Sequence, residues 1–216
     1  MFGNSLQKYM ILIPAVLIAL MFHELAHGLV AYWLGDDTAK RAGRLTLNPL
    51  DHLDPLGTLC MIFFGFGWAK PVPVNPSRFR HRKVGMALTA LAGPLANFLL
   101  SFVLIFAALL MQSLAPTNQI LLALSRFFIQ TGQLSVCLGV FNLIPIPPLD
   151  GSRVLQVLLP NKIYYKLYQY EAYFQIGLIV LLFLGAFNNL LYTLQVDMLS
   201  LIVEGAARVL SVLGLL

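Results

Sequence analysis

The chain has 216 residues, of which 59% are hydrophobic and only 11% charged, and its mean hydropathy is +0.81. Since a soluble domain carries about a quarter charged residues, this composition excludes a soluble globular protein and indicates an integral membrane protein. The net charge of +5 does not indicate nucleic-acid binding, because the basic residues cluster between apolar segments, as the positive-inside rule expects.

The first apolar segment runs from Tyr9 to Leu34 and is predicted to cross the membrane as a helix, for which about 20 residues suffice. Near its end stand His23, Glu24 and His27, in the pattern His-Glu-Leu-Ala-His. Histidines four residues apart lie on one face of a helix, so both imidazoles can bind one zinc ion. The glutamate is rotated by about 100° from the first histidine and can stand beside the ion. The pattern predicts a zinc site that lacks its third ligand.

The region after this segment does not have the pattern of a simple span. Residues 44–48 and 72–75 alternate polar and apolar side chains, which predicts two short strands of a membrane-associated β-hairpin. Residues 58–68 are apolar but too short to span, so a re-entrant or interfacial segment is expected. His52 lies between them in an Asp-His-Leu-Asp loop. The sequence leaves open whether it joins the site or makes ordinary loop hydrogen bonds.

Four more apolar segments follow, at about residues 84–114, 120–144, 172–187 and 190–213. The first of these is expected to be broken early, at Gly93-Pro94, because proline removes a helical hydrogen bond. The predicted fold is an all-α polytopic membrane protein with about five to six transmembrane helices and a small β-hairpin and re-entrant region between the first two core helices. Residues 1–216 are taken as one domain, with a catalytic core at about 9–151 and accessory helices at about 152–216. Cys60 and Cys137 fall in apolar stretches and are expected to be buried thiols.

Charge bias predicts the orientation and a third ligand. If the first span runs from outside to inside, only Lys8 and Arg126 face outwards, and the cytoplasmic side receives Lys40, Arg41, Arg44, Lys70, the basic cluster Arg78 to Lys83, Arg153, Lys162 and Lys166. Asp150 ends another inward-running span and comes to the depth of the histidine pair. Pro-Leu-Asp-Gly is also ordinary turn chemistry. Two histidines and a carboxylate with an open fourth position are, however, the ligand pattern of catalytic zinc.

Three motifs occur in order: His-Glu-Leu-Ala-His at 23–27, Gly-Pro-Leu-Ala-Asn at 93–97 and Asn-Leu-Ile-Pro-Ile-Pro-Pro-Leu-Asp-Gly at 142–151. Together they resemble the site-2 protease family of intramembrane zinc metalloproteases, which are M50-like peptidases, and within it the short bacterial type. The link at 115–118 is expected to leave no room for the PDZ domains of some members, and no CBS domain is expected.

The resemblance implies one catalytic zinc ion and roles for six residues: zinc ligation for His23, His27 and Asp150, a catalytic base at Glu24, and a lining of the site by Asn142 and Asn97. It implies a metalloendopeptidase of the bacterial cell membrane, with its active site towards the cytoplasm. The expected partners are a transmembrane protein or peptide substrate and the lipid bilayer, not nucleic acid. The oligomeric state is left open.

The mechanism expected from these roles is attack by activated water, with Glu24 as proton carrier. Asn142 or Asn97 would donate to the oxyanion, and for Asn97 helix–helix hydrogen bonding is an equal alternative. An extended substrate is expected to pair with an edge strand, although the hairpin is equally consistent with a cover over the site. Two other functions remain open: a membrane metal-ion transporter or channel that uses the same cluster as a permeation site, and an inactive binding homologue.

Overall fold

The structure, a computed structural model, describes residues 2–57, 69–155 and 157–215, and its regular elements are helices. The elements are α1 (Phe2–Trp33), α2 (Thr38–Arg41), the 3-10 helices η1 (Pro49–His52) and η2 (Pro76–Arg78), α4 (Arg82–Leu114), α5 (Gln119–Asn142), α6 (Asp150–Leu155), α7 (Asn161–Gln169), α8 (Glu171–Phe183) and α9 (Asn188–Val212). The predicted all-α class is confirmed.

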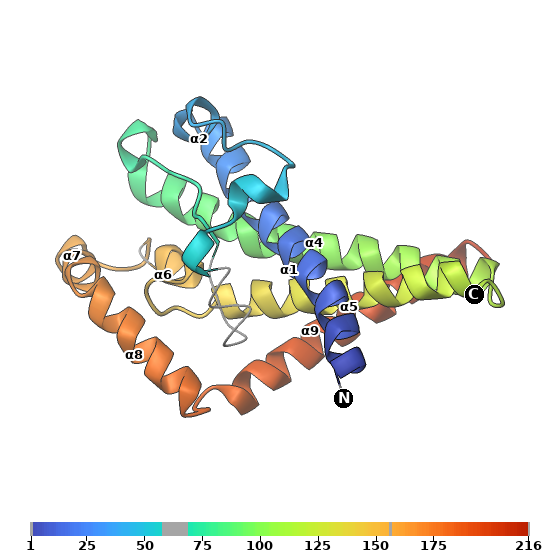
Figure 1. The fold of residues 1–216 in the computed structure, drawn as a ribbon. Coiled ribbons are helices and arrows are strands. Elements are labelled where there is room, and N and C mark those ends of the chain that lie inside the picture. The colour runs from blue at the N-terminus through green and yellow to red at the C-terminus, as the bar shows by residue number, and fades with distance from the viewer. Residues whose placement is uncertain (1, 58–68, 156, 216) are drawn as a thin grey trace.

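The bundle is organised around α4 (Figure 1). The short link at residues 115–118 returns the chain so that α5 runs beside α4, and α1 crosses both helices. α9 packs on α4 and α5, where an apolar cluster is formed by Ile105, Val136, Val140, Ile202 and Ala206. α6 also contacts α4. α1, with the residues near 23, and α6, with the residues near 150, therefore pack against the same helix, α4.

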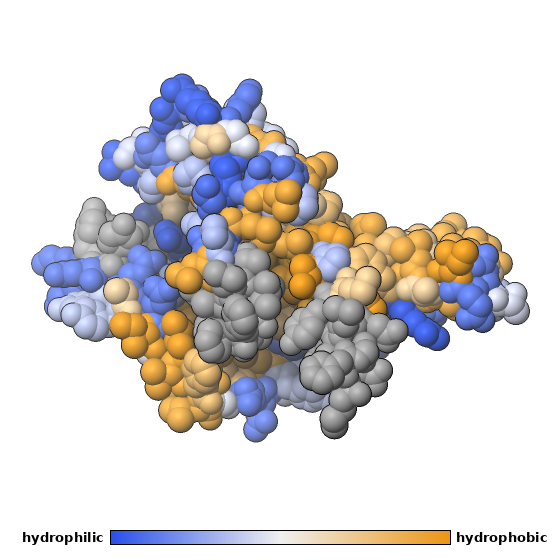
Figure 2. Space-filling model, in the orientation of Figure 1, coloured by the Kyte–Doolittle hydropathy of each residue, from blue (hydrophilic) through white to orange (hydrophobic). Residues whose placement is uncertain are grey.

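Four described helices are long and apolar enough to cross a membrane: Met10–Trp33 within α1, α4, α5 and α9. α8 is apolar, but its 13 residues fall short of the roughly 20 that a span needs. The predicted number of five to six spans is therefore not reached in the part of the chain that the structure describes. Apolar residues cover most of the surface where α4, α5 and α9 project together and the surface of α8, whereas hydrophilic residues gather around α2 (Figure 2). The protein is a membrane protein.

The predicted break at Gly93-Pro94 was wrong, since α4 is continuous from Arg82 to Leu114 with Pro94 inside it. Proline removes one backbone donor from a helix. Membrane helices tolerate this loss because packing against neighbouring helices keeps the remaining backbone groups satisfied. Pro94 is fully buried, in keeping with such support.

The predicted β-hairpin was also wrong. Residues 44–48 and 72–75 form no strand, and the described residues around them contain one isolated bridge, between Leu53 and Ala69. Residues 70–75 are in neither helix nor strand, Asn75 has extended dihedral angles, and Lys70 and Val72 each precede a proline, which favours extended backbone; we call residues 69–75 the extended stretch. Residues 58–68, predicted to re-enter the membrane, and with them Cys60, lie outside the described residues.

Two backbone N–H groups of this stretch donate to side chains and not to a neighbouring strand. The backbone N–H of Val72 donates to Glu24 Oε2 at 2.9 Å, and the N–H of Asn75 donates to Asp36 Oδ2 at 2.5 Å. The prolines on either side of Val72 have no N–H to give. Because a β-ladder needs backbone donors for a neighbouring strand, this stretch lies beside α1 without forming a sheet.

The turn at the end of α1 positions Asp36, the first acidic residue after the helix. Gly35 has a φ of 102°, and its N–H donates to the carbonyl of Tyr32, while the N–H of Asp36 donates to Ala31. This is the Schellman motif, which ends helices at a glycine with positive φ. It turns Asp36 back into the protein, where its side chain is fully buried. Cys137 is a free thiol, as predicted, but it is half-buried and not fully buried, and its sulfur accepts a hydrogen bond from Gln195.

Candidate metal centre

His23 and His27 of α1 meet Asp150, the first residue of α6. His23 Nε2 lies 3.0 Å and His27 Nε2 lies 3.2 Å from Asp150 Oδ2. The two Nε2 atoms are 3.0 Å apart. Only 4% of His23 and 9% of His27 is exposed. Among the described residues, these three form the group of potential metal ligands that lies close together.

The spacing suits a small tetrahedral ion. Ligand atoms about 2.0–2.2 Å from a tetrahedral zinc lie roughly 3.3 Å from one another, and the three separations here are 3.0, 3.0 and 3.2 Å. Two imidazoles and one carboxylate are also the donor set of catalytic zinc, which leaves a fourth position for water or substrate. The residues present therefore fit a zinc ion.

The outer nitrogen of each imidazole contacts α4. His27 Nδ1 lies 2.7 Å from the carbonyl oxygen of Thr89, and His23 Nδ1 lies 3.1 Å from the side-chain amide of Asn97. Contacts of this kind orient the rings of ligating histidines. α4 therefore supports both rings from the side opposite Asp150.

Gly93 makes room for the two rings between α1 and α4. A β-carbon at this position would lie 2.5 Å from His27 Nε2 and 2.6 Å from His23 Cε1. Both distances are far below carbon contact distances of about 3.5–4.0 Å, so any side chain here would displace the rings. The motif Gly-Pro-Leu-Ala-Asn thus supplies space at Gly93 and an amide one helical turn later at Asn97.

Asp150 is positioned by a tight approach of the chain to itself. A β-carbon on the following Gly151 would lie 2.6 Å from the carbonyl oxygen of Ile144, so only glycine fits there. Burial by itself raises the pKa of the Asp150 carboxyl, but hydrogen bonds and charge from His23 and His27 hold that pKa well below its usual range. The carboxyl is therefore ionised at neutral pH, which is the form that binds metal.

The candidate ligands open onto a cavity of about 530 Å³. Glu24 lines this cavity beside the histidines, and the extended stretch contributes Val72 and Val74 to its wall. Because the Val72 N–H donates to Glu24 Oε2, this wall also holds the glutamate carboxylate at the cavity. The cavity is also lined by Arg153 of α6 and Glu171 of α8, whose charged atoms lie 3.7 Å apart.

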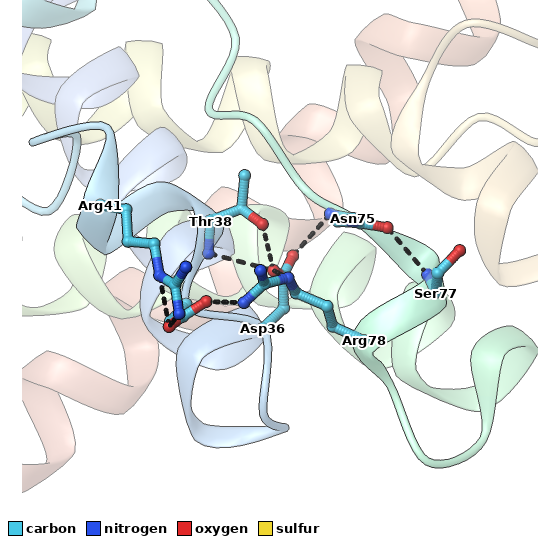
Figure 3. Close-up of polar contacts among 7 residues, drawn as sticks. Asp36, Thr38, Arg41, Asn75, Ser77 and Arg78 are labelled. Atoms are coloured by element: carbon cyan, nitrogen blue, oxygen red, sulfur yellow. Dashed lines mark hydrogen bonds and ion pairs between the residues drawn. The ribbon is translucent and has the colours of Figure 1, made fainter.

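A polar clamp fastens the extended stretch to the end of α1 (Figure 3). The buried carboxylate of Asp36 accepts from the backbone N–H of Thr38 at 3.0 Å and from that of Asn75 at 2.5 Å. Arg78 forms an ion pair with Asp37 and lies 4.0 Å from Asp36 Oδ1. The clamp therefore sets where the stretch begins its path over the cavity.

The three further residues predicted to belong to the site lie in different surroundings. Asn142 lines the cavity. Asn97 is fully buried next to His23 and is not among the residues that line the cavity. His52 is buried in η1, where its Nε2 contacts the carbonyl of Thr46 at 3.0 Å, and it does not line the cavity either. The roles of these three residues stay predictions, and the geometry of His52 favours the loop hydrogen bond.

Several contributors were not singled out from the sequence. Thr89 and Val72 act through backbone atoms, so their side chains carry no signal of it. Arg153 and Gly93 could have been found. Arg153 follows Asp150 by three residues at the start of a helix, which puts both on one face, and Gly93 stands in a motif of small residues.

The fold and this geometry define a class: a polytopic membrane protein with a His-His-Asp candidate metal site inside its helix bundle. Comparison with known proteins agrees. Residues 113–184 match the model of peptidase family M50. The chain is 44% identical over 184 residues to "Putative zinc metalloprotease YwhC" of Bacillus subtilis, which covers 83% of this chain and 81% of that protein.

A second relative is more distant. The chain is 29% identical over 153 residues to "Putative zinc metalloprotease Rip2" of Mycolicibacterium smegmatis, covering 68% of this chain and 57% of that protein. No solved structure matches the chain. The chain belongs to peptidase family M50. The resemblance to site-2 proteases is thereby confirmed. The relatives are named as putative zinc metalloproteases, which is the class of enzyme that the sequence predicted.

Proposed function

We propose that this protein is an intramembrane zinc endopeptidase that cleaves membrane-spanning proteins, with the ion held by His23, His27 and Asp150. The observation that carries the proposal is the convergence of three ligand atoms within a bundle of membrane-crossing helices, on a cavity that Glu24 also lines. Membership of family M50 and relatives named as zinc metalloproteases support it.

Glu24 is the general base of the proposed reaction. Zinc, when bound, supplies a Lewis acid and lowers the pKa of water towards about 7. The Glu24 carboxylate takes a proton from water as the water attacks the scissile carbonyl, and it then delivers that proton to the departing amine. The Val72 N–H keeps the carboxylate at the cavity wall during both transfers.

Asn142 is the proposed donor to the developing oxyanion. Its Nδ2 donates to the carbonyl of Leu138 at 3.0 Å. An amide nitrogen carries two hydrogens, so this bond orients the side chain and leaves the second hydrogen for the substrate carbonyl. Donors that are already oriented towards the developing charge are the most effective ones in catalysis.

The extended stretch at 69–75 is the proposed support for an unwound substrate. A helical substrate must expose its peptide bonds before attack, and in a membrane the exposed backbone needs partners. Of the two stretches expected to form strands, only this one lines the cavity, through Pro71, Val72 and Val74. A proline at Leu47, which is 63% exposed, should therefore leave cleavage unchanged, whereas Val74→Pro, which removes a backbone donor, should reduce cleavage.

We place the active site towards the cytoplasm. His27 stands six residues before the end of α1 at Trp33, which is roughly 9 Å along a helix. The same end of α1 contacts α2, which carries Lys40 and Arg41. Arg78 of η2 forms an ion pair with Asp37, just beyond that end. Basic loops favour the cytoplasmic side. A membrane-impermeant thiol reagent should label Thr38→Cys only after the inner face is opened.

The decisive experiment uses the purified full-length chain in detergent, with zinc content and cleavage of a membrane-spanning peptide both measured. Glu24→Gln should keep its zinc and lose cleavage by about 10²–10⁴-fold, the usual contribution of general acid–base catalysis. Glu204→Gln, an exposed position on α9, is the matched control and should cleave like the wild type. A chelator should abolish cleavage, and added zinc should restore it.

The outcomes separate the competing functions. Undiminished cleavage by Glu24→Gln would contradict the assigned base. A wild-type protein that binds no zinc would contradict the metal site. Zinc flux into vesicles without any cleavage would favour the transporter, and zinc binding with neither flux nor cleavage would favour the inactive homologue.

A further inference from the structure

The outer nitrogens of the two candidate histidine ligands have different partners. His27 Nδ1 lies 2.7 Å from the carbonyl oxygen of Thr89. A carbonyl oxygen only accepts hydrogen bonds, so the neutral form of His27, which is the form that binds a metal, carries its proton on Nδ1. Its Nε2 therefore keeps a lone pair for a metal, and nothing further is needed to select this tautomer.

His23 has no such carbonyl partner. Its Nδ1 faces the side chain of Asn97 at 3.1 Å, and an amide offers both a donor and an acceptor. If the amide nitrogen donated to Nδ1, the ring proton would have to sit on Nε2, where it blocks ligation. Only the amide oxygen, accepting from Nδ1–H, leaves Nε2 of His23 free for the ion. The choice of amide orientation therefore decides whether the site has three ligands or two.

The side-chain amide of Asn97 has one partner, His23, and its other end is without a hydrogen-bond partner among the described residues. With its nitrogen turned to His23, the amide buries Oδ1 without a hydrogen-bond partner among the described residues. A buried acceptor without a partner costs about 1–3 kcal/mol, and Asn97 is 0% exposed. Rotation of the amide by half a turn exchanges the two atoms, gives this oxygen the Nδ1–H of His23 as its donor and leaves the amide nitrogen without a partner instead. The two orientations therefore lose similar hydrogen bonds, and the need of a metal for an unprotonated Nε2 on His23 selects the accepting one.

The backbone at Asn97 is held independently of the ring. Ser135 of α5 donates from Oγ to the backbone carbonyl of Asn97 at 2.9 Å. Gly93, one turn earlier, keeps α4 close to α1. The short amide therefore reaches His23 from a fixed position, and its location behind the ring, away from the cavity lining, keeps it from the substrate.

We propose that Asn97 is a positioning residue: its side-chain carbonyl accepts from His23 Nδ1–H and thereby holds His23 in the tautomer and orientation that present Nε2 to the metal. This inference rests on the proposed zinc site and replaces the role of oxyanion donor for Asn97. Partners that orient ligating histidines in this way typically contribute 10–100-fold to metal affinity.

The test is the zinc dissociation constant of the full-length protein in detergent, measured by competition with a chromophoric chelator. Asn97→Leu, which removes the acceptor at similar volume, should weaken zinc binding by about 10–100-fold. Asn97→Asp, which keeps an acceptor and has no N–H, should bind zinc about as tightly as the wild type. The visible spectrum of the cobalt-substituted protein should report a four-coordinate site in the wild type and Asn97→Asp and a disturbed site in Asn97→Leu.

Gln112→Leu is the matched control, because it makes the same kind of change on α4 and removes a hydrogen bond to Ser125 of α5, about four helical turns from Asn97. It should lower the thermal midpoint of the metal-free protein and leave zinc affinity unchanged. Wild-type affinity in Asn97→Leu would overturn the inference. So would an Asn97→Asp variant that folds, by its thermal midpoint, and binds zinc as weakly as Asn97→Leu, since the amide N–H would then be the required group. A wild type without zinc would instead contradict the proposed function.

Discussion

The two halves of α4 differ in what they bury. In its first half, Thr89, Gly93 and Asn97 follow one another at four-residue intervals and face the histidines of α1. In its second half, Ile105 packs with α5 and with Ile202 of α9 in a wholly apolar cluster. One helix therefore serves a polar site at one end and apolar packing at the other.

The difference shows how one membrane helix keeps the residues of the metal site apart from the residues that hold the bundle together. Lipid is as apolar as leucine, so association of membrane helices depends on close packing and on buried hydrogen bonds. The second half relies mainly on packing, with a hydrogen bond from Gln112 to Ser125 of α5 beside it. The first half replaces large side chains with glycine and polar groups, each directed at a histidine. Damage to the first half should therefore affect zinc, and damage to the second half should affect stability alone.

The largest effect is expected from Gly93→Ala. Because the new β-carbon would lie 2.5 Å from His27 Nε2, the rings must move by about 1 Å to reach ordinary contact, and zinc affinity should fall by at least about 100-fold, beyond the loss of a single orienting partner. The measurement is zinc content after dialysis against a weak chelator.

Gly205→Ala is the control for this substitution. Its β-carbon would meet Phe102 at 3.6 Å, an ordinary contact, so zinc content should match the wild type. Full zinc retention by Gly93→Ala would show that the rings are not held against α4, and the contrast between the two halves would fail.

A smaller effect is expected from Asp36→Asn in the clamp, which lies in neither half of α4. The buried carboxylate loses its charge towards Arg78 and part of its hydrogen bonding to Thr38 and Asn75. Hydrogen bonds to charged groups contribute about 1.5–3 kcal/mol, so the free energy of unfolding should fall by about that amount. Cleavage should fall while zinc content stays constant, because the clamp acts on the stretch that holds Glu24 and not on the ligands.

The matched control is Asp37→Asn. Asp37 pairs with Arg41 and Arg78 at the surface, where such pairs contribute at most about 1 kcal/mol. Its effect on cleavage should be the weaker one. Loss of zinc from Asp36→Asn would contradict the separation between the clamp and the metal site.

The smallest effect is expected from Ile202→Val in the apolar cluster. Removal of one buried methyl group costs about 0.5–1.5 kcal/mol, so the thermal midpoint should fall slightly. Zinc content and cleavage per folded molecule should not change. Ile120→Val, at a position that is 79% exposed, should leave the midpoint unchanged. A change in zinc content in Ile202→Val would show that the two halves of α4 are coupled.

Much of the architecture could be predicted from the sequence. Long apolar runs predicted the spans now seen as α1, α4, α5 and α9, because hydrocarbon thickness imposes length and composition on each helix alone. Charge bias brought Asp150 to the depth of the histidine pair, and the structure places it 3.0 Å from His23. That inference needed only chain direction and loop charge.

The errors share one physical cause. Alternating side chains at 72–75 predicted a strand, but the N–H groups of Val72 and Asn75 donate to Glu24 and Asp36 instead. Gly93-Pro94 predicted a break, but the surrounding helices accommodate the proline. In the first case distant side chains bind the backbone donors, and in the second the packing of neighbouring helices surrounds the proline. Both causes are tertiary, and a local pattern does not report them.

The sequence by itself determined the chemical types of the site: two imidazoles on one helix face, a glutamate beside them and a carboxylate at matching depth. Helical periodicity and membrane insertion are local properties, and they are enough for that. Only the tertiary structure decided that the three ligand atoms meet within hydrogen-bond distance, that Gly93 leaves room for the rings, and that Thr89 and Asn97 face their outer nitrogens. These contacts depend on how closely α4 crosses α1, and that distance is set by packing across the whole bundle.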